Sequence, residues 1–255
     1  MIIKGIIFDV YGTLIDIQTD EGYEEIYRAI SHFLTYHEIY MHRWEVKDAY
    51  YRIMENQRKA CSEEHFEFDA VEVWREFLKQ NSGDSALPSY KSKQLPLFLA
   101  EMYRAVSRKR LQLYPGVKAL LDELRPRFRI AAVSDAQKIW LVPEMRAVGI
   151  GSYFKPVIIS SDLGFRKPDR RIFETALSGL KLEPKEVIFV GNDMYRDMFG
   201  ARQLGLNTVF FSSNQGRKEM EGVDPDYTIY EFAELRQAIR FFEQNQQNPS
   251  FQRNR

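Results

Sequence analysis

The 255-residue sequence has little cysteine, no excess of charge of one sign and no long apolar run. Cys61 is the single cysteine, which excludes an intrachain disulfide and fits a reducing compartment. The 36 basic and 36 acidic residues cancel, so no overall field would attract nucleic acid or an anionic membrane. No stretch reaches the roughly 18 apolar residues that a membrane-spanning helix needs. The sequence therefore predicts a cytoplasmic protein without nucleic-acid or membrane partners.

What the sequence does contain is a set of short β-branched runs that each end in a polar loop. They cover residues 2–10, 129–134, 156–160, 187–191 and 207–211. Nearly continuous apolar runs are typical of parallel strands that are buried on both faces. Helical patterns lie between the runs. This alternation predicts an α/β fold built on a doubly wound, parallel, Rossmann-like sheet.

Residues 16–107 differ from the rest of the chain. They show no clear strand, many aromatic residues and helical spacing of apolar positions, for example at Val71, Trp74 and Phe77. We interpret them as an all-helical insertion, which leaves residues 1–15 and 108–244 as the core. The basic run at 104–110 is expected to be a solvated hinge. The polar residues 245–255 lack periodicity and are expected to be disordered.

Residues that can carry chemistry follow four of the predicted strands. They are Asp9, Gly12 and Thr13, then Ser134 and Asp135, then Lys167, and finally Asn192, Asp193 and Asp197. In an open α/β sheet, ligands sit outside the carboxyl ends of the strands, so parallel strands would bring all these groups to one rim. A carboxylate there can act as a nucleophile, an ammonium and a hydroxyl can bind an anion, and two acidic groups can share Mg²⁺.

The segments around these residues resemble the four motifs of one enzyme family. FDVYGTL, AAVSD, GFRKPD and VGNDMYRD are similar, in this order, to the motifs of the haloacid dehalogenase superfamily of aspartate-nucleophile hydrolases. The resemblance covers the whole chain, and the predicted insertion lies where the family has an α-helical cap. It implies a capped hydrolase, monomeric or homodimeric, that acts on a small anionic substrate and excludes water from its site.

The resemblance also implies roles for individual residues. Asp9 is expected to be the covalent nucleophile, oriented by Thr13. Ser134 is expected to bind the substrate oxyanion, and Lys167 to pair with Asp9 and with that anion. The other expected positions are Tyr11, Gly12 and Asp135 beside the substrate, and Asp9, the Tyr11 backbone carbonyl, Asn192, Asp193 and Asp197 around Mg²⁺.

The sequence departs from the family's phosphatases at three positions. Tyr11 stands where many of them carry a second aspartate, the general acid, and an ordinary tyrosine pKa near 10 suits that work poorly. The 2-haloacid dehalogenases have tyrosine there and release a halide, which needs no proton. Asn192 replaces a metal-binding aspartate, with Asp193 one residue late. Asp135 replaces the asparagine that often follows the motif-two serine.

Three functions therefore remain open at this stage. A Mg²⁺-dependent phosphatase of a small phosphorylated metabolite is favoured by the acidic fourth motif. A metal-independent 2-haloacid dehalogenase is the alternative that Tyr11 suggests. A binding or regulatory protein that has lost catalysis would explain all three departures.

Overall fold

A computed structural model describes residues 2–82 and 89–245. Its centre is a parallel sheet with the spatial order β5-β4-β1-β6-β7-β8. The strands are β1 (Gly5–Phe8), β4 (Arg129–Ser134), β5 (Val157–Ile159), β6 (Val187–Gly191), β7 (Asn207–Phe211) and β8 (Tyr227–Ile229). Numbered along the chain, this order is 3-2-1-4-5-6, that of a Rossmann-type sheet. The predicted fold class is confirmed. β8 was not predicted, because its residues follow the polar segment Asp224-Pro225-Asp226 and do not form an apolar run in the sequence.

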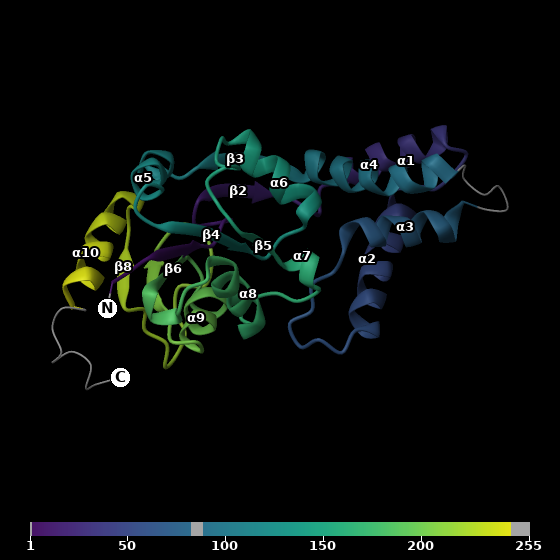
Figure 1. The fold of residues 1–255 in the computed structure, drawn as a ribbon. Helices are drawn as coiled ribbons and strands as arrows, with labels where there is room; N and C mark the ends of the chain where they lie inside the picture. Colours follow the sequence, from purple (N-terminus) through teal and green to yellow (C-terminus); the bar gives the residue numbers. More distant parts are fainter. Residues whose placement is uncertain (1, 83–88, 246–255) are drawn as a thin grey trace.

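Helices cover both faces of the sheet (Figure 1). Side chains alternate along a strand, so Ile6 and Phe8 of β1 pack on one side and Ile7 on the other. The first side is covered by α5 (Val117–Leu124), α6 (Lys138–Ala147) and α10 (Leu235–Asn245), and the second by α8 (Arg170–Leu180) and α9 (Gly200–Arg202). Short turns complete the connections: α7 (Ser160–Leu163), η1 (Pro184–Glu186), η2 (Met194–Phe199) and η3 (Phe232–Glu234). In residues 2–82 and 89–245, no helix is both long and apolar enough to span a membrane.

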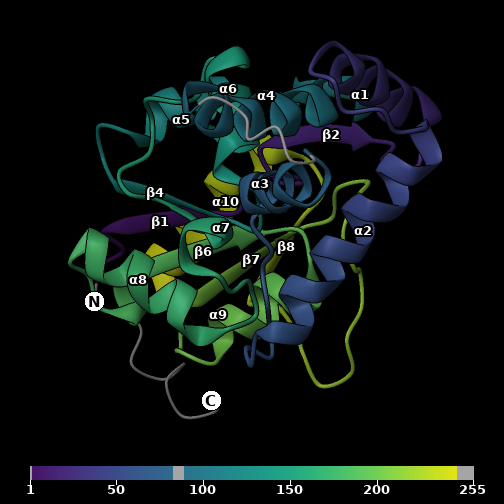
Figure 2. The same ribbon diagram turned by 90° about the vertical axis from the view of Figure 1, so that its right-hand side faces the viewer.

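Four helices form an insertion between two antiparallel strands, β2 (Ile15–Thr19) and β3 (Arg108–Leu113). They are α1 (Glu24–Tyr36), α2 (Arg43–Ala60), α3 (Ala70–Asn81) and α4 (Ser89–Ser107). Figure 1 shows them gathered at the end of the molecule opposite α10, and in Figure 2 this end faces the viewer. Tyr50, Trp74, Phe77 and Tyr103 are buried in a cluster that also takes in Trp140 of α6. The predicted helices are present. That the insertion is a separate domain with limits at residues 16 and 107 remains a prediction.

Two predictions about this insertion were wrong. No strand was expected in residues 16–107, but β2 reaches Thr19; its partner β3 lies far away in the sequence, so the local pattern carried little signal. The run 104–110 was expected to be solvated, but Arg104 is buried against a carboxylate from α6. The expected disorder of the tail concerns residues 246–255, which lie outside the described residues, while α10 extends to Asn245.

Candidate active site

The segment DVYGTL forms a tight turn at the carboxyl end of β1. Thr13 Oγ1 donates to Asp9 Oδ2 at 2.9 Å, so the turn orients the carboxylate. Gly12 has a φ of +88°, and a Cβ at this position would collide with the side chain of Asn192. Glycine is therefore required both by the turn and by the close approach of the loop that follows β6. Asp9 and Thr13 are both buried.

Lys167 joins the loop after β5 to this turn. Its Nζ lies 2.6 Å from Asp9 Oδ1 and 2.6 Å from Asp197 Oδ1, and its side chain is 2% exposed. Burial opposes the charge of the ammonium, but attraction to Asp197 and Asp9 outweighs it and raises the pKa of Lys167 above its ordinary value. Lys167 is therefore a fixed positive charge beside the candidate nucleophile.

Asp197 holds the loop after β6 in place. Its Oδ2 accepts hydrogen bonds from the backbone amides of Asn192 and Asp193, each at 3.0 Å. Burial raises the pKa of Asp197 to about 6, although the Lys167 ammonium acts in the opposite direction. Because both of its oxygens have partners, Asp197 connects the loop to Lys167 and acts as a structural anchor of the site.

Asn192, rather than Asp193, lies beside Asp9. Asn192 Oδ1 accepts from Thr13 Oγ1 at 3.3 Å, the hydroxyl that also contacts Asp9. Asp193 instead caps η2: its Oδ1 accepts from the Tyr195 and Arg196 amides, and its Oδ2 from the Arg196 guanidinium and the Arg217 amide. Within the described part of the chain, no three His, Cys, Asp or Glu side chains are grouped so that they could hold a metal.

Ser134 and Asp135 follow β4, next to β1 in the sheet. Ser134 Oγ is buried and has no hydrogen-bond partner among the described residues. Asp135 Oδ1 accepts from the Lys167 amide at 2.9 Å, whereas its Oδ2 has only Arg196 Nη1, at 3.7 Å. Burial raises the pKa of Asp135, against the pull of Lys167 and Arg196. A buried hydroxyl without a partner is costly unless a ligand completes it, which suits an anion-binding position.

The Tyr11 side chain is engaged by a carboxylate and is poorly placed to give its proton to a substrate. Its hydroxyl donates a short hydrogen bond to Glu144 Oε2 of α6. Burial and the Glu144 charge raise the pKa of Tyr11 well above its ordinary value. Arg104 and Arg108 also bind Glu144, at 2.8 and 3.1 Å; these hydrogen bonds and that of Tyr11 outweigh burial and lower the pKa of Glu144. The Tyr11 proton is therefore held by a carboxylate that stays ionised.

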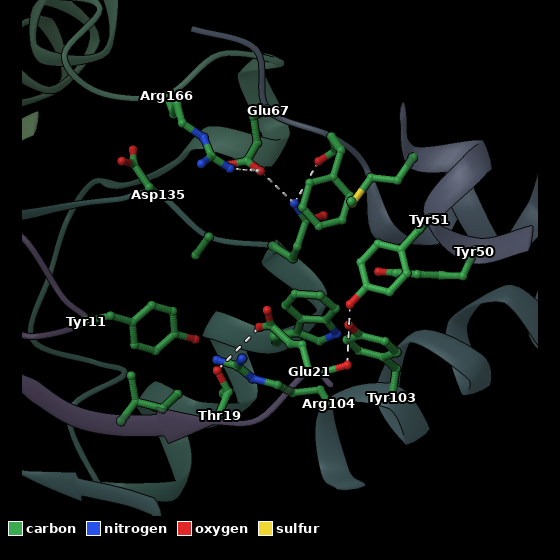
Figure 3. A pocket seen from close by; sticks show the side chains of 16 residues that line it. Tyr11, Thr19, Glu21, Tyr50, Tyr51, Glu67, Tyr103, Arg104, Asp135 and Arg166 are labelled. Carbon is green, nitrogen blue, oxygen red and sulfur yellow. Dashed lines mark hydrogen bonds and ion pairs between the residues drawn. The ribbon is translucent and has the colours of Figure 1, made fainter. Parts of the chain in front are cut away.

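A cavity of about 420 Å³ lies between the helical insertion and the sheet (Figure 3). Tyr50, Tyr51 and Tyr103 come from the insertion and face Tyr11 and Asp135 of the sheet side. Phe68, Trp140, Met54, Ile17, Ala136 and several polar groups complete the wall. Aromatic residues of the insertion therefore form a large part of the wall of this cavity.

Glu67 connects the insertion to the wall of the cavity on the sheet side. Its carboxylate is buried and accepts from Ser160 Oγ at 2.7 Å, Arg166 Nη2 at 2.7 Å and Gln137 Nε2 at 3.1 Å. Glu67, Arg104 and Glu144 were not identified from the sequence. Their partners lie 36 or more positions away, so no local pattern reveals them; the basic run at 104–110 was the one available signal, and it was interpreted as solvated.

Comparisons with known proteins agree with this geometry. The model of the haloacid dehalogenase-like hydrolases matches residues 3–205. A glyceraldehyde 3-phosphate phosphatase of Pyrococcus furiosus is 28% identical over 52% of this chain and 55% of its own length. A phosphoserine phosphatase of Thermus thermophilus is 33% identical over 50% of this chain and 51% of its own. The chain thus spans about half the length of the curated relatives that it matches.

A solved 2-haloacid dehalogenase of Pseudomonas syringae superposes with a TM-score of 0.71 over 95% of this chain and 100% of its own, at 21% identity, which supports the fold alone. The chain belongs to the haloacid dehalogenase-like hydrolases. The resemblance of the four motifs is therefore confirmed at the level of the family.

Proposed function

We propose that the protein is a hydrolase that uses Asp9 as a covalent nucleophile and a phosphate monoester as substrate. The observation that carries the proposal is the pairing of Asp9 with Lys167 at 2.6 Å. The strand before Asp9, β1, is the neighbour of β4, which ends at Ser134 with its unpartnered hydroxyl. A carboxylate, a fixed ammonium and an open hydroxyl form a site for attack on an anion. Sequence relatives with phosphatase names support phosphate over other anions.

The reaction has two steps. An Asp9 oxygen attacks phosphorus, the ester P–O bond breaks with its electron pair, and the leaving oxygen takes its proton from a water molecule in the site, because the Tyr11 proton is bound to Glu144. Water then attacks phosphorus, the bond to Asp9 breaks, and inorganic phosphate and a free carboxylate result. Lys167 and Ser134 hold the phosphate oxygens throughout. The helical insertion acts as a cap that keeps bulk water out.

The oxygen donors at and beside Asp9 could hold Mg²⁺, but only weakly, because one of them is a neutral amide. Asn192 Oδ1 and Asp9 Oδ2 share the Thr13 hydroxyl, so an amide oxygen and a carboxylate lie side by side. Asp9, the Tyr11 carbonyl and Asn192 would hold the ion, with Asp193 and Asp197 occupied elsewhere; one carboxylate plus substrate oxygens is a donor set that Mg²⁺ accepts. Bound Mg²⁺ would neutralise charge on the transferred phosphoryl group. A cytoplasmic location and a monomeric or dimeric state stay predictions.

A second candidate, metal-independent 2-haloacid dehalogenation, is favoured by Tyr11. No carboxylic acid stands in the general acid position, and a halide leaves without a proton. In this reading, Asp9 attacks carbon and halide leaves; water then hydrolyses the resulting ester.

One assay separates these functions. Phosphate release from a panel of phosphate monoesters is measured with Mg²⁺ and with excess chelator, alongside halide release from 2-chloropropionate, for the native protein and Asp9→Asn. We expect Mg²⁺-stimulated phosphate release that falls by about 10³-fold or more in Asp9→Asn, because the nucleophile is lost. Halide release in chelator alone would establish the dehalogenase. Activity equal to that of Asp9→Asn on every compound would support a protein without catalysis.

A further inference from the structure

The cavity described above is lined by flat aromatic surfaces on the side of the insertion. Tyr50 and Tyr103 of the insertion stack with ring centroids 4.9 Å apart, and Tyr103 stacks at 6.0 Å on Trp140 of α6, so these buried rings are packed mainly on one another. Tyr51 is only partly buried, and its hydroxyl accepts from Tyr27 at 3.2 Å, which fixes its ring. A volume of about 420 Å³ lies within the range of small-molecule sites, about 300–1,000 Å³. The partly exposed rings of Tyr11, Tyr51 and Phe68 also line the cavity, which therefore suits an aromatic ring that can pack against them.

Both arginines that line the cavity are paired with buried carboxylates, Arg104 with Glu144 and Arg166 with Glu67. Aromatic walls can bind a cation, but Arg104 already provides one: its guanidinium lies 5.5 Å from the Tyr11 ring centroid and 5.2 Å from that of Trp140. The second arginine of the wall, Arg166, lies 2.7 Å from Glu67 in the same lining. The face of an uncharged aromatic ring is compatible with the Arg104 guanidinium plane.

The acid that the site lacks points to the same class of compound. Tyr11 cannot readily give its proton to a leaving oxygen, because Glu144 accepts it. The pKa of an alcohol is near the value of about 15.7 for water, so an alkoxide is a poor leaving group unless it is protonated as it leaves. A phenolate is far more stable, since the pKa of a phenol is about 10. A site without a general acid can therefore cleave a phenol ester more readily than an alkyl ester.

We propose that the preferred substrates are aryl phosphate monoesters, whose ring occupies this cavity and whose phenolic oxygen leaves as phenolate. The inference rests on the proposed phosphatase function. In its first step, the bond from Asp9 to phosphorus forms, the bond from phosphorus to the aryl oxygen breaks with its electron pair, and the phenolate takes a proton from solvent. The two supporting observations, the aromatic wall and the engaged Tyr11 hydroxyl, are independent of each other.

Three esters separate the ring from the leaving group. Phenyl, benzyl and cyclohexylmethyl phosphate are compared by kcat/KM in the native protein. Benzyl and cyclohexylmethyl phosphate both release an alkoxide, so their ratio reports stacking of the ring; we expect about three- to tenfold in favour of benzyl. Phenyl and benzyl phosphate both carry a ring, so their ratio reports the leaving group; we expect at least about tenfold in favour of phenyl.

The outcomes are distinct for each claim. For substituted phenyl phosphates, kcat/KM should rise steeply as the pKa of the phenol falls; a flat series, or equal rates for benzyl and cyclohexylmethyl phosphate, would overturn the inference. Faster turnover of phosphocholine than of phenyl phosphate would overturn it too. No turnover above Asp9→Asn on any ester would instead remove the phosphatase. In that case, tighter binding of benzylphosphonate than of cyclohexylmethylphosphonate would still support the aromatic site, and equal binding would remove it.

A pair of matched variants tests the position of the ring. Tyr51→Leu removes a ring from the cavity wall but keeps an apolar side chain. Tyr40→Leu makes the same change at a residue of the insertion that is 77% exposed and does not line the cavity. We expect Tyr51→Leu to lower the benzyl-to-cyclohexylmethyl ratio by about threefold, and Tyr40→Leu to leave it unchanged. Equal ratios in both variants would place the ring elsewhere.

Discussion

The rim of the sheet and the wall of the helical insertion contribute to the candidate site in different ways. On the rim, Asp9, Thr13 and Lys167 are joined by direct hydrogen bonds of 2.6–2.9 Å, and each comes after a strand of the sheet. On the wall, Tyr50, Tyr51 and Tyr103 are arranged by packing between helices. The rim thus consists of polar groups held by hydrogen bonds, whereas the wall consists of aromatic side chains whose packing determines the shape of the cavity.

Breaking the rim should give the largest effect. Lys167→Met leaves Asp9 and Asp197 as buried carboxylates without their shared cation. We expect a loss of about 3–5 kcal/mol in the free energy of unfolding, measured with urea, and a fall in kcat/KM of at least about 10²-fold. In the matched control Lys138→Met, the ion pair with Asp162 is exposed, so less than about 1 kcal/mol should be lost. Similar losses in both variants would contradict the role of burial.

Glu144→Gln tests the contact between the rim and the wall. The amide can still accept from Tyr11, but it removes the charge that Arg104 and Arg108 share. We expect a loss of about 2 kcal/mol at pH 7, measured by thermal unfolding, because Arg104 stays buried without a counter-charge. The control Glu123→Gln alters an exposed ion pair with Arg236 and should change little.

The same pair predicts a pH dependence. The folded protein holds the pKa of Glu144 below its ordinary value near 4.5, so the carboxylate stabilises the fold fully above that pH. Its contribution is lost as the pH falls through the lower folded value. The difference in melting temperature between the native protein and Glu144→Gln should therefore be constant from pH 7 to about 5 and shrink below about 4.5. A difference that grows with acidity would have the wrong sign.

A glycine pair gives the smallest expected effect and sharpens the description of the rim. Gly216 and Gly205 both have positive φ, +80° and +74°. A Cβ on Gly216 would collide with the backbone of Asn192, whereas one on Gly205 meets nothing within 4 Å. Gly205→Ala should cost about 1 kcal/mol from backbone strain alone. Gly216→Ala should cost more and also lower kcat/KM; equal stability and full activity would show that Asn192 moves freely.

The rim could be predicted from the sequence because its residues come after strands of the sheet. An apolar run such as that of β1 identifies a strand that is buried in the sheet. Because a parallel sheet brings the carboxyl ends of its strands together, Asp9, Ser134 and Lys167 could be identified without knowledge of their neighbours in space. Glu144 could not be found in this way. Its function depends on where α6 and α4 pack, and nothing in its local sequence distinguishes it from a solvated glutamate. The position of Asn192, rather than Asp193, beside Asp9 likewise depends on the capping of η2 by Asp193.

The pairing of Thr19 with Arg108 has a consequence for the evolution of this family. The chain enters and leaves the helical insertion through neighbouring strands, so the two ends of the excursion lie side by side. A different set of helices could be joined at these two points while the strands of the sheet keep their order and register. Substitutions in the insertion can then change substrate selectivity while the residues on the sheet are retained. Exchange of this segment between relatives offers a route to enzymes with new substrate preferences.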